Sequence, residues 1–202
     1  SSNLGKDWAM DCVYVKVYPC CSWIQAAVQQ LVALRGPQPL QPQDIRQVRI
    51  GVSSYAAKNN GEPAPVDTMG AQYSFPYCAA LALSGDPTDP RMYLEKAIDD
   101  AERRALARRV ELYVDGEMEA AYPKHYGSRI ELNLASGERR TSFVLDPHGM
   151  PADPVNDRER LDKFSRLAGY AKPAERVDDI ARAIQRCEQL SSVRELMELI
   201  RN

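Results

Sequence analysis

The chain has 202 residues, a net charge of −2 and 44% hydrophobic residues, values typical of a globular protein with one or two domains. Arginine and lysine are mixed with acidic residues in runs such as 102–104 and 158–160, which argues against nucleic-acid binding. No apolar run approaches the ~20 residues needed to cross a bilayer, and no signal-peptide pattern opens the chain. We therefore expect a cytoplasmic protein that binds neither nucleic acid nor membrane.

Cysteine and histidine show no metal-binding spacing. The five cysteines are odd in number, irregularly placed and without a C-x-x-C motif, so neither a disulfide framework nor a zinc site is indicated. The two histidines, His125 and His148, lie in turn-like sequence and have no ligand partner at usable spacing. We therefore expect a reducing compartment and no metal.

A short strand is expected over residues 12–16, after a segment without a clear pattern. Residues 1–11 show no periodicity and are assigned no role. Residues 12–16 alternate as a strand does, and this places Lys16 near the end of that strand.

An amphipathic helix follows. Apolar residues recur at helical spacing from Ile24 onward, and the Gly-Pro pair at 36–37 ends the helix. Ser22 and Gln25 have the S-x-x-Q spacing of a capping box at its start. For Gln25 the alternative to capping is an acid/base role.

The middle of the chain is expected to hold one strand and several helices. The pattern predicts a strand over 46–53, a buried helix over 71–83, a helix over 90–98 and another that ends near 107. Residues 55–66 are rich in Asn, Gly and Pro and are typical of a surface loop, which is either a mobile lid or a plain connection.

The later part is expected to hold a β-hairpin and then only helices. Alternation predicts strands over 110–114, 130–134 and 139–145, the last two joined as a hairpin. Residues 146–154 form a boundary rich in proline, and three helical patterns follow, the first capped by Asn156.

These elements predict an α+β fold, in which helices cover one face of a small sheet with a late β-hairpin, followed by an all-helical C-terminal segment. We assign 1–11 to a leader, 12–150 to the α+β domain and 151–202 to the helical segment.

Four blocks carry a resemblance to a known family. They read KVYPCCSWIQ from Lys16, DTMGAQYSFPYCAALALSGD from Asp67, VELYVDGE from Val110, and DPHGMPADPVNDRERLDKFSRLAG from Asp146. In this order they resemble the C-terminal part of the MmgE/PrpD family, which includes 2-methylcitrate dehydratase, cis-aconitate decarboxylase and iminodisuccinate epimerase. The resemblance begins near Val13 and covers less than half of a typical member, because the large N-terminal helical domain is missing.

The resemblance implies an enzyme, a lyase or isomerase that uses no cofactor. It dehydrates, decarboxylates or epimerises small di- or tricarboxylates, and its active site lies between a lid-type domain, here 12–150, and the N-terminal helical domain or subunit. Residues 151–202 would dock on that absent domain, and the protein would be a homodimer. The isolated chain is expected to be inactive.

The resemblance implies catalytic roles for Lys16 and Cys21. A lysine ammonium can pair with a substrate carboxylate or act as a base when it is desolvated; the alternative is a solvated lysine at a strand end. Cys21 occupies the place of a catalytic histidine in the decarboxylase branch. It would need a lowered pKa to act as a nucleophile or base, and the alternative is a small core residue.

The same resemblance implies substrate contacts for Tyr18 and Tyr73. His125, which stands beside Lys124 and between Tyr122 and Tyr126, is a further candidate for a substrate contact. Tyr73 could equally be a core residue with a bonded hydroxyl. A non-catalytic interaction or structural module derived from the family remains the alternative function. Cys21 and Gln25, which replace a histidine found in some branches, favour that alternative, whereas Lys16 favours the enzyme.

Overall fold

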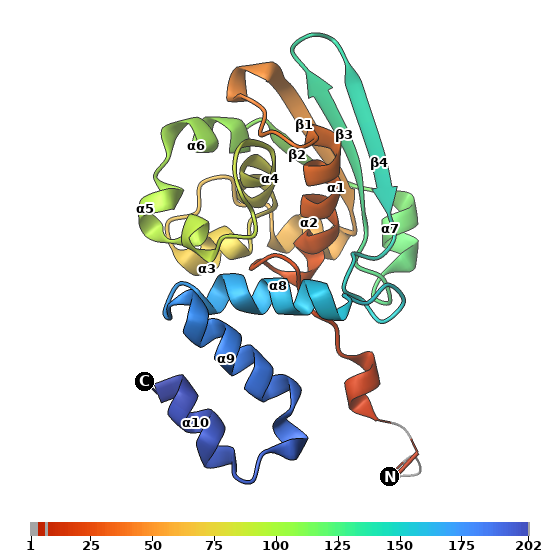
Figure 1. Ribbon diagram of the computed structural model, residues 1–202. Helices are drawn as coiled ribbons and strands as arrows, with labels where there is room; N and C mark the ends of the chain where they lie inside the picture. The colour runs from red at the N-terminus through yellow and green to blue at the C-terminus, as the bar shows by residue number, and fades with distance from the viewer. Residues whose placement is uncertain (1–3, 7, 202) are drawn as a thin grey trace. The chain divides into compact units, whose positions relative to one another are not determined.

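The computed structural model describes residues 4–6 and 8–201 (Figure 1). The chain divides into two compact units, one ending at Pro154 and the other beginning at Val155. Each unit is described by itself.

The first unit is built on a sheet whose strands are ordered β2-β1-β3-β4. Strand β1 pairs with β2 in parallel and with β3 antiparallel, and β3 and β4 form the predicted hairpin. This architecture confirms the α+β fold with a small sheet and a late hairpin. The strand bounds are β1 (Ile45–Val52), β2 (Val110–Val114), β3 (Ser128–Leu134) and β4 (Arg139–Val144).

The predicted strand over 12–16 is wrong. Residues Ala9–Cys12 form a 3-10 helix, η1, and residues 13–16 have no regular secondary structure and lie outside the four strands of the described chain. The amide of Val15 donates to the carbonyl of Gly149, which lies in a turn and not in a strand. Alternation therefore reports which side chains share a face, but it does not supply a partner strand.

Helices cover one face of the sheet, where α1 packs on β3 and β4, and α4 packs on α1, α6 and β2 (Figure 1). Alternate strand residues such as Val48, Ile50, Ile130 and Leu132 are fully buried in this layer. The remaining bounds in this unit are α1 (Gln25–Arg35), α2 (Ser54–Asn59), α3 (Thr68–Gln72), α4 (Phe75–Ser84), α5 (Glu95–Ile98), α6 (Ala101–Ala107), α7 (Gly116–Ala121), and the 3-10 helices η2 (Ser22–Ile24), η3 (Pro42–Asp44) and η4 (Pro90–Tyr93).

Three predictions for the middle of the chain are corrected by the structure. The helix predicted over 71–83 is two helices, α3 and α4, because the Ser74 hydroxyl accepts from the Tyr77 amide at 3.0 Å and starts α4. The expected loop over 55–66 contains most of α2, which Ser53 caps. The helix predicted over 90–98 is interrupted between η4 and α5 at Leu94, whose backbone is extended.

The second unit consists of α8 (Asp157–Ala168), α9 (Ala174–Gln185), η5 (Cys187–Gln189) and α10 (Val193–Arg201). Asn156 and Glu159 form a capping box at the start of α8, which confirms the predicted cap. A groove of about 540 Å³ lies between α8 and α9, and its apolar lining includes Leu161, Phe164 and Ile184. Several apolar side chains in this unit are exposed to solvent, notably Val193, Met197 and Ile200 of α10.

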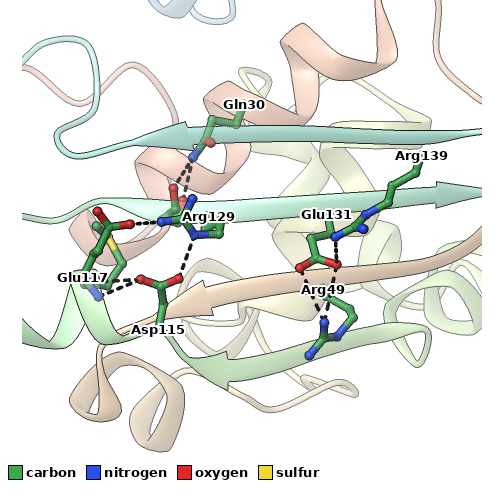
Figure 2. A network of polar contacts seen from close by, with 9 residues as sticks. Gln30, Arg49, Asp115, Glu117, Arg129, Glu131 and Arg139 are labelled. Carbon is green, nitrogen blue, oxygen red and sulfur yellow. Dashed lines mark hydrogen bonds and ion pairs between the residues drawn. The ribbon is translucent and has the colours of Figure 1, made fainter.

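The other face of the sheet carries paired charges (Figure 2). Glu131 forms ion pairs with Arg49 at 3.4 Å and with Arg139 at 2.8 Å. Arg129 forms ion pairs with Asp115 at 2.8 Å and with Glu117. Such surface pairs contribute little stability one by one.

Gly51 of β1 is required by close packing on this face. A Cβ atom at this position would lie 2.7 Å from the ring of Tyr113 and 2.9 Å from Cβ of Asp115. We expect Gly51→Ala to lower the free energy of unfolding by about 1–3 kcal/mol, the usual cost of overpacking. Urea unfolding of the chain measures it.

Gly116→Ala is the matched control, because a Cβ atom there meets nothing within 4 Å among the described residues. We expect a change of no more than about 0.5 kcal/mol, as at an ordinary surface site. Equal costs for the two variants would contradict the packing explanation.

Candidate functional site

One end of the sheet gathers the segments that carry the candidate residues. The register pairs Val52 with Val114 and Ser128 with Val144, so the loops that follow β1, β2 and β4 and the loop before β3 meet there. Gln30 of α1 donates its amide hydrogens to the Ser128 carbonyl at 3.0 Å and hydroxyl at 2.8 Å. This contact brings the start of α1, and the residues leading into it, to the same end.

Gln25 holds the turn that precedes α1. Its buried side-chain oxygen accepts from the Tyr18 amide at 3.1 Å. Its nitrogen lies 2.9 Å from the Tyr18 carbonyl, 3.0 Å from the Cys20 carbonyl and 3.2 Å from the Cys20 sulfur. The predicted capping box with Ser22 is therefore wrong: Ser22 lies inside η2, whose N-cap is Cys21, and the Gln25 amide points back toward the turn.

Cys21 lies next to both Lys16 and the end of α3. Its amide donates to the carbonyl of Gln72 at 2.8 Å, which brings the neighbouring Tyr73 to the same region. Burial raises the pKa of the Cys21 thiol, and the Trp23 amide and the Lys16 charge oppose this effect only in part. The thiol is therefore protonated at neutral pH, the opposite of what a nucleophile or base requires.

The remaining candidates in this part of the chain differ in exposure. Lys16 and Tyr73 are exposed, and the structure brings both near Cys21. The phenol of Tyr18 packs against the hydrophobic core instead, and burial raises its pKa to about 12. The nearby charge of Arg35 lowers this pKa and that of Asp86 raises it. The structure therefore groups Lys16, Cys21 and Tyr73, and directs Tyr18 elsewhere.

An aromatic cluster joins this segment to the turn at 122–126. The ring centroid of Trp23 lies 4.6 Å from Tyr126, 5.4 Å from Tyr122 and 5.6 Å from Tyr55. Tyr55 and Tyr122 also stack on each other at 5.7 Å. Because aromatic pairs of this kind add to burial energy, the cluster fixes the turn against the start of α1. The sequence interpretation missed this cluster, whose members lie in three separate segments.

His125 lies in this turn and is paired with a carboxylate. Its Nδ1 atom is 2.6 Å from Oδ2 of Asp146, and the other Asp146 oxygen accepts from the Tyr126 amide at 3.3 Å. The His125 side chain is 37% exposed and the Asp146 side chain 24%. The sequence pattern gives Asp146 no role beyond the start of the boundary segment 146–154. The hairpin β3–β4 separates it from His125, so sequence spacing offered no signal for the pair.

Within residues 4–6 and 8–201 the His, Cys, Asp and Glu side chains form no group of three or more suited to hold a metal ion. Over the same residues, none of the helices combines the length and the apolar character that crossing a membrane requires.

The fold and the sequence blocks define a class of protein. Residues 18–189 match the family model of the MmgE/PrpD C-terminal domain, so the chain belongs to the MmgE/PrpD family. This match confirms the resemblance drawn from the four blocks.

Relatives within this family are decarboxylases by name. The chain is 24% identical to cis-aconitate decarboxylase of Aspergillus terreus and 25% identical to the cis-aconitate decarboxylase-like protein oryM of Aspergillus oryzae. The alignments cover 98% and 99% of this chain but only 42% and 43% of those proteins. The chain thus spans less than half the length of the curated relatives it matches.

Removing the Gln25 amide should loosen the turn it holds. We expect Gln25→Ala to lower the free energy of unfolding by about 1–3 kcal/mol, because the Tyr18 amide and the Cys20 carbonyl lose the partner that this side chain provides. Urea unfolding measures the loss. Gln43→Ala, at an exposed position of η3, is the control and should change stability by no more than about 0.5 kcal/mol. Indistinguishable variants would show that the turn does not depend on Gln25.

Proposed function

We propose that the chain is the C-terminal part of a cofactor-independent lyase or isomerase that acts on small di- or tricarboxylates. Decarboxylation is the reaction to test first, because the relatives are named cis-aconitate decarboxylase and cis-aconitate decarboxylase-like protein. The observation that carries the proposal is the grouping of exposed Lys16 with Cys21 and Tyr73 at one end of the sheet, in a member of the MmgE/PrpD family. Its active site is completed by an N-terminal helical domain or subunit.

The grouped side chains suit the demands of such a reaction. An anionic substrate needs a fixed cation, and the Lys16 ammonium can pair with one of its carboxylates. When carbon dioxide leaves, the electron pair of the broken C–C bond stays on the substrate and must take up a proton. The Cys21 thiol, which burial keeps protonated, can act as a donor, and the exposed Tyr73 hydroxyl can bind a carboxylate.

The second unit has surfaces that suit contact with a further domain or subunit. Its exposed apolar side chains, together with the apolar groove between α8 and α9, are the kind of surface that another domain or subunit covers. We propose that the N-terminal helical domain docks on this unit and that the whole protein is a homodimer.

A specific observation favours the alternative of a non-catalytic module. The raised pKa of Cys21 removes one residue that could have served as a base. Activity measurements on the chain alone, and on the chain joined to an N-terminal helical domain of the family (the completed protein), separate the two functions.

The isolated chain should show no enzyme-like turnover of cis-aconitate, citrate or 2-methylcitrate, because a site of this chemistry needs further positioned acid and base groups. The completed protein should convert at least one of them, measured by carbon dioxide release and by NMR of the products. Turnover by the isolated chain would contradict the shared site. Inactivity of both toward all three substrates would favour the non-catalytic module.

Replacing Lys16 should affect catalysis and not stability. In the completed protein, Lys16→Ala should lower kcat/KM at least ~100-fold, the lower end for a positioned acid/base group. The free energy of unfolding should change by less than ~0.5 kcal/mol, because the side chain is exposed. Lys58→Ala, at another exposed lysine in α2, is the control. A Lys16→Ala protein that unfolds but keeps full specific activity would assign this lysine to structure.

A further inference from the structure

We propose that Asp146 is a positioning residue that holds His125 with its Nε2 atom free to transfer a proton in the active site, a role that rests on the proposed function. The observation is the short contact between His125 and Asp146 on a turn that aromatic packing ties to the segment carrying Cys21.

The contact decides where the ring carries its hydrogen. An ionised carboxylate only accepts hydrogen bonds, so at 2.6 Å from Oδ2 of Asp146 the Nδ1 atom of His125 must be the donor. In the neutral ring the lone pair is then on Nε2, which can accept a proton. After that transfer the ring is a cation beside Asp146, and the carboxylate stabilises it while Nε2 can return the proton.

Both partners are held in place from outside the pair. The second oxygen of Asp146 accepts from the Tyr126 amide, so the carboxylate is hydrogen-bonded both to the ring of His125 and to the backbone of the next residue. Tyr122 and Tyr126, on either side of His125, pack on Trp23. Trp23 belongs to η2, whose N-cap is Cys21. A side chain fixed in this way by its surroundings is the kind that can position a reacting atom.

The chain contains an internal comparison. His148 also places Nδ1 near a carboxylate, 2.9 Å from Asp153, but Asp153 lies five residues away in the same loop and its side chain is 71% exposed. That pair closes a local loop. Asp146, by contrast, comes from the end of β4 and joins segments that are 21 residues apart.

The tautomer of His125 tests the positioning directly in the chain itself. With 15N-labelled histidine, at a pH where both rings are neutral, we expect Nε2 of His125 to resonate as an unprotonated nitrogen. In Asp146→Asn the side-chain oxygen still accepts the hydrogen bond from the Tyr126 amide, so the new NH₂ group faces Nδ1 of His125. An NH₂ group only donates hydrogen bonds, so Nδ1 must then be the acceptor. The hydrogen should therefore move to Nε2. Asp153→Asn should leave His125 unchanged. A wild-type ring with its hydrogen on Nε2, or no response to Asp146→Asn, would overturn the proposal.

The proton-transfer role is tested in the completed protein with cis-aconitate as the probe. Asp146→Asn and His125→Gln should each lower kcat at least ~100-fold, whereas Asp153→Asn and His148→Gln should keep the wild-type kcat. If the wild type is active and the first two variants are equally active, the role of His125 is wrong and the proposed function stands. If the wild type converts no polycarboxylate, the proposed function fails and the proton-transfer role with it, while the tautomer result still decides whether Asp146 orients the ring.

Discussion

The buried amide of Gln25 is the contact on which the arrangement of the candidate site depends. It pairs with the amide of Tyr18 and with the carbonyls of Tyr18 and Cys20, in a turn where the Tyr18 carbonyl also accepts from the Cys20 amide at 2.9 Å. Helix α1 is hydrogen-bonded to β3 through Gln30 and Ser128. The position of the turn relative to the sheet is therefore set by α1. The position of Cys21, and through the Gln72 carbonyl that of Tyr73, follows from this chain of contacts.

The sheet was predictable where one face is buried. Val48 and Ile50, like Ile130 and Leu132, alternate with polar residues because helices cover one face only, so strands β1, β3 and β4 were located to within two residues at each end. Helices α2 and α7 were missed, because each is one or two turns long and starts at a polar cap, Ser53 or Asp115, too short for an apolar period to appear.

The candidate site was predictable where the family blocks carry its residues, as for Tyr73 in the block that begins at Asp67. Lys16 and Cys21 share one segment, and the family motif marked both. The spacing of Ser22 and Gln25 fits a capping box, yet the chain turns there in a 3-10 helix, and the geometry of the motif needs a full α-helical turn. His125 and Asp146 meet because the hairpin between them returns to its starting edge, which only the strand register determines.

The protonation states at this end of the sheet favour a division of roles. Burial already outweighs the Lys16 charge in raising the pKa of Cys21. A domain that covers this end would remove more water from the thiol and strengthen the same effect, so Cys21 would hold its proton more firmly in the completed site. For the dehydration or epimerisation included in the proposed function, a proton acceptor would then have to come from another group. An imidazole whose Nδ1 hydrogen is held by a carboxylate keeps its lone pair on Nε2, and His125 meets that requirement without any change in the surrounding turn.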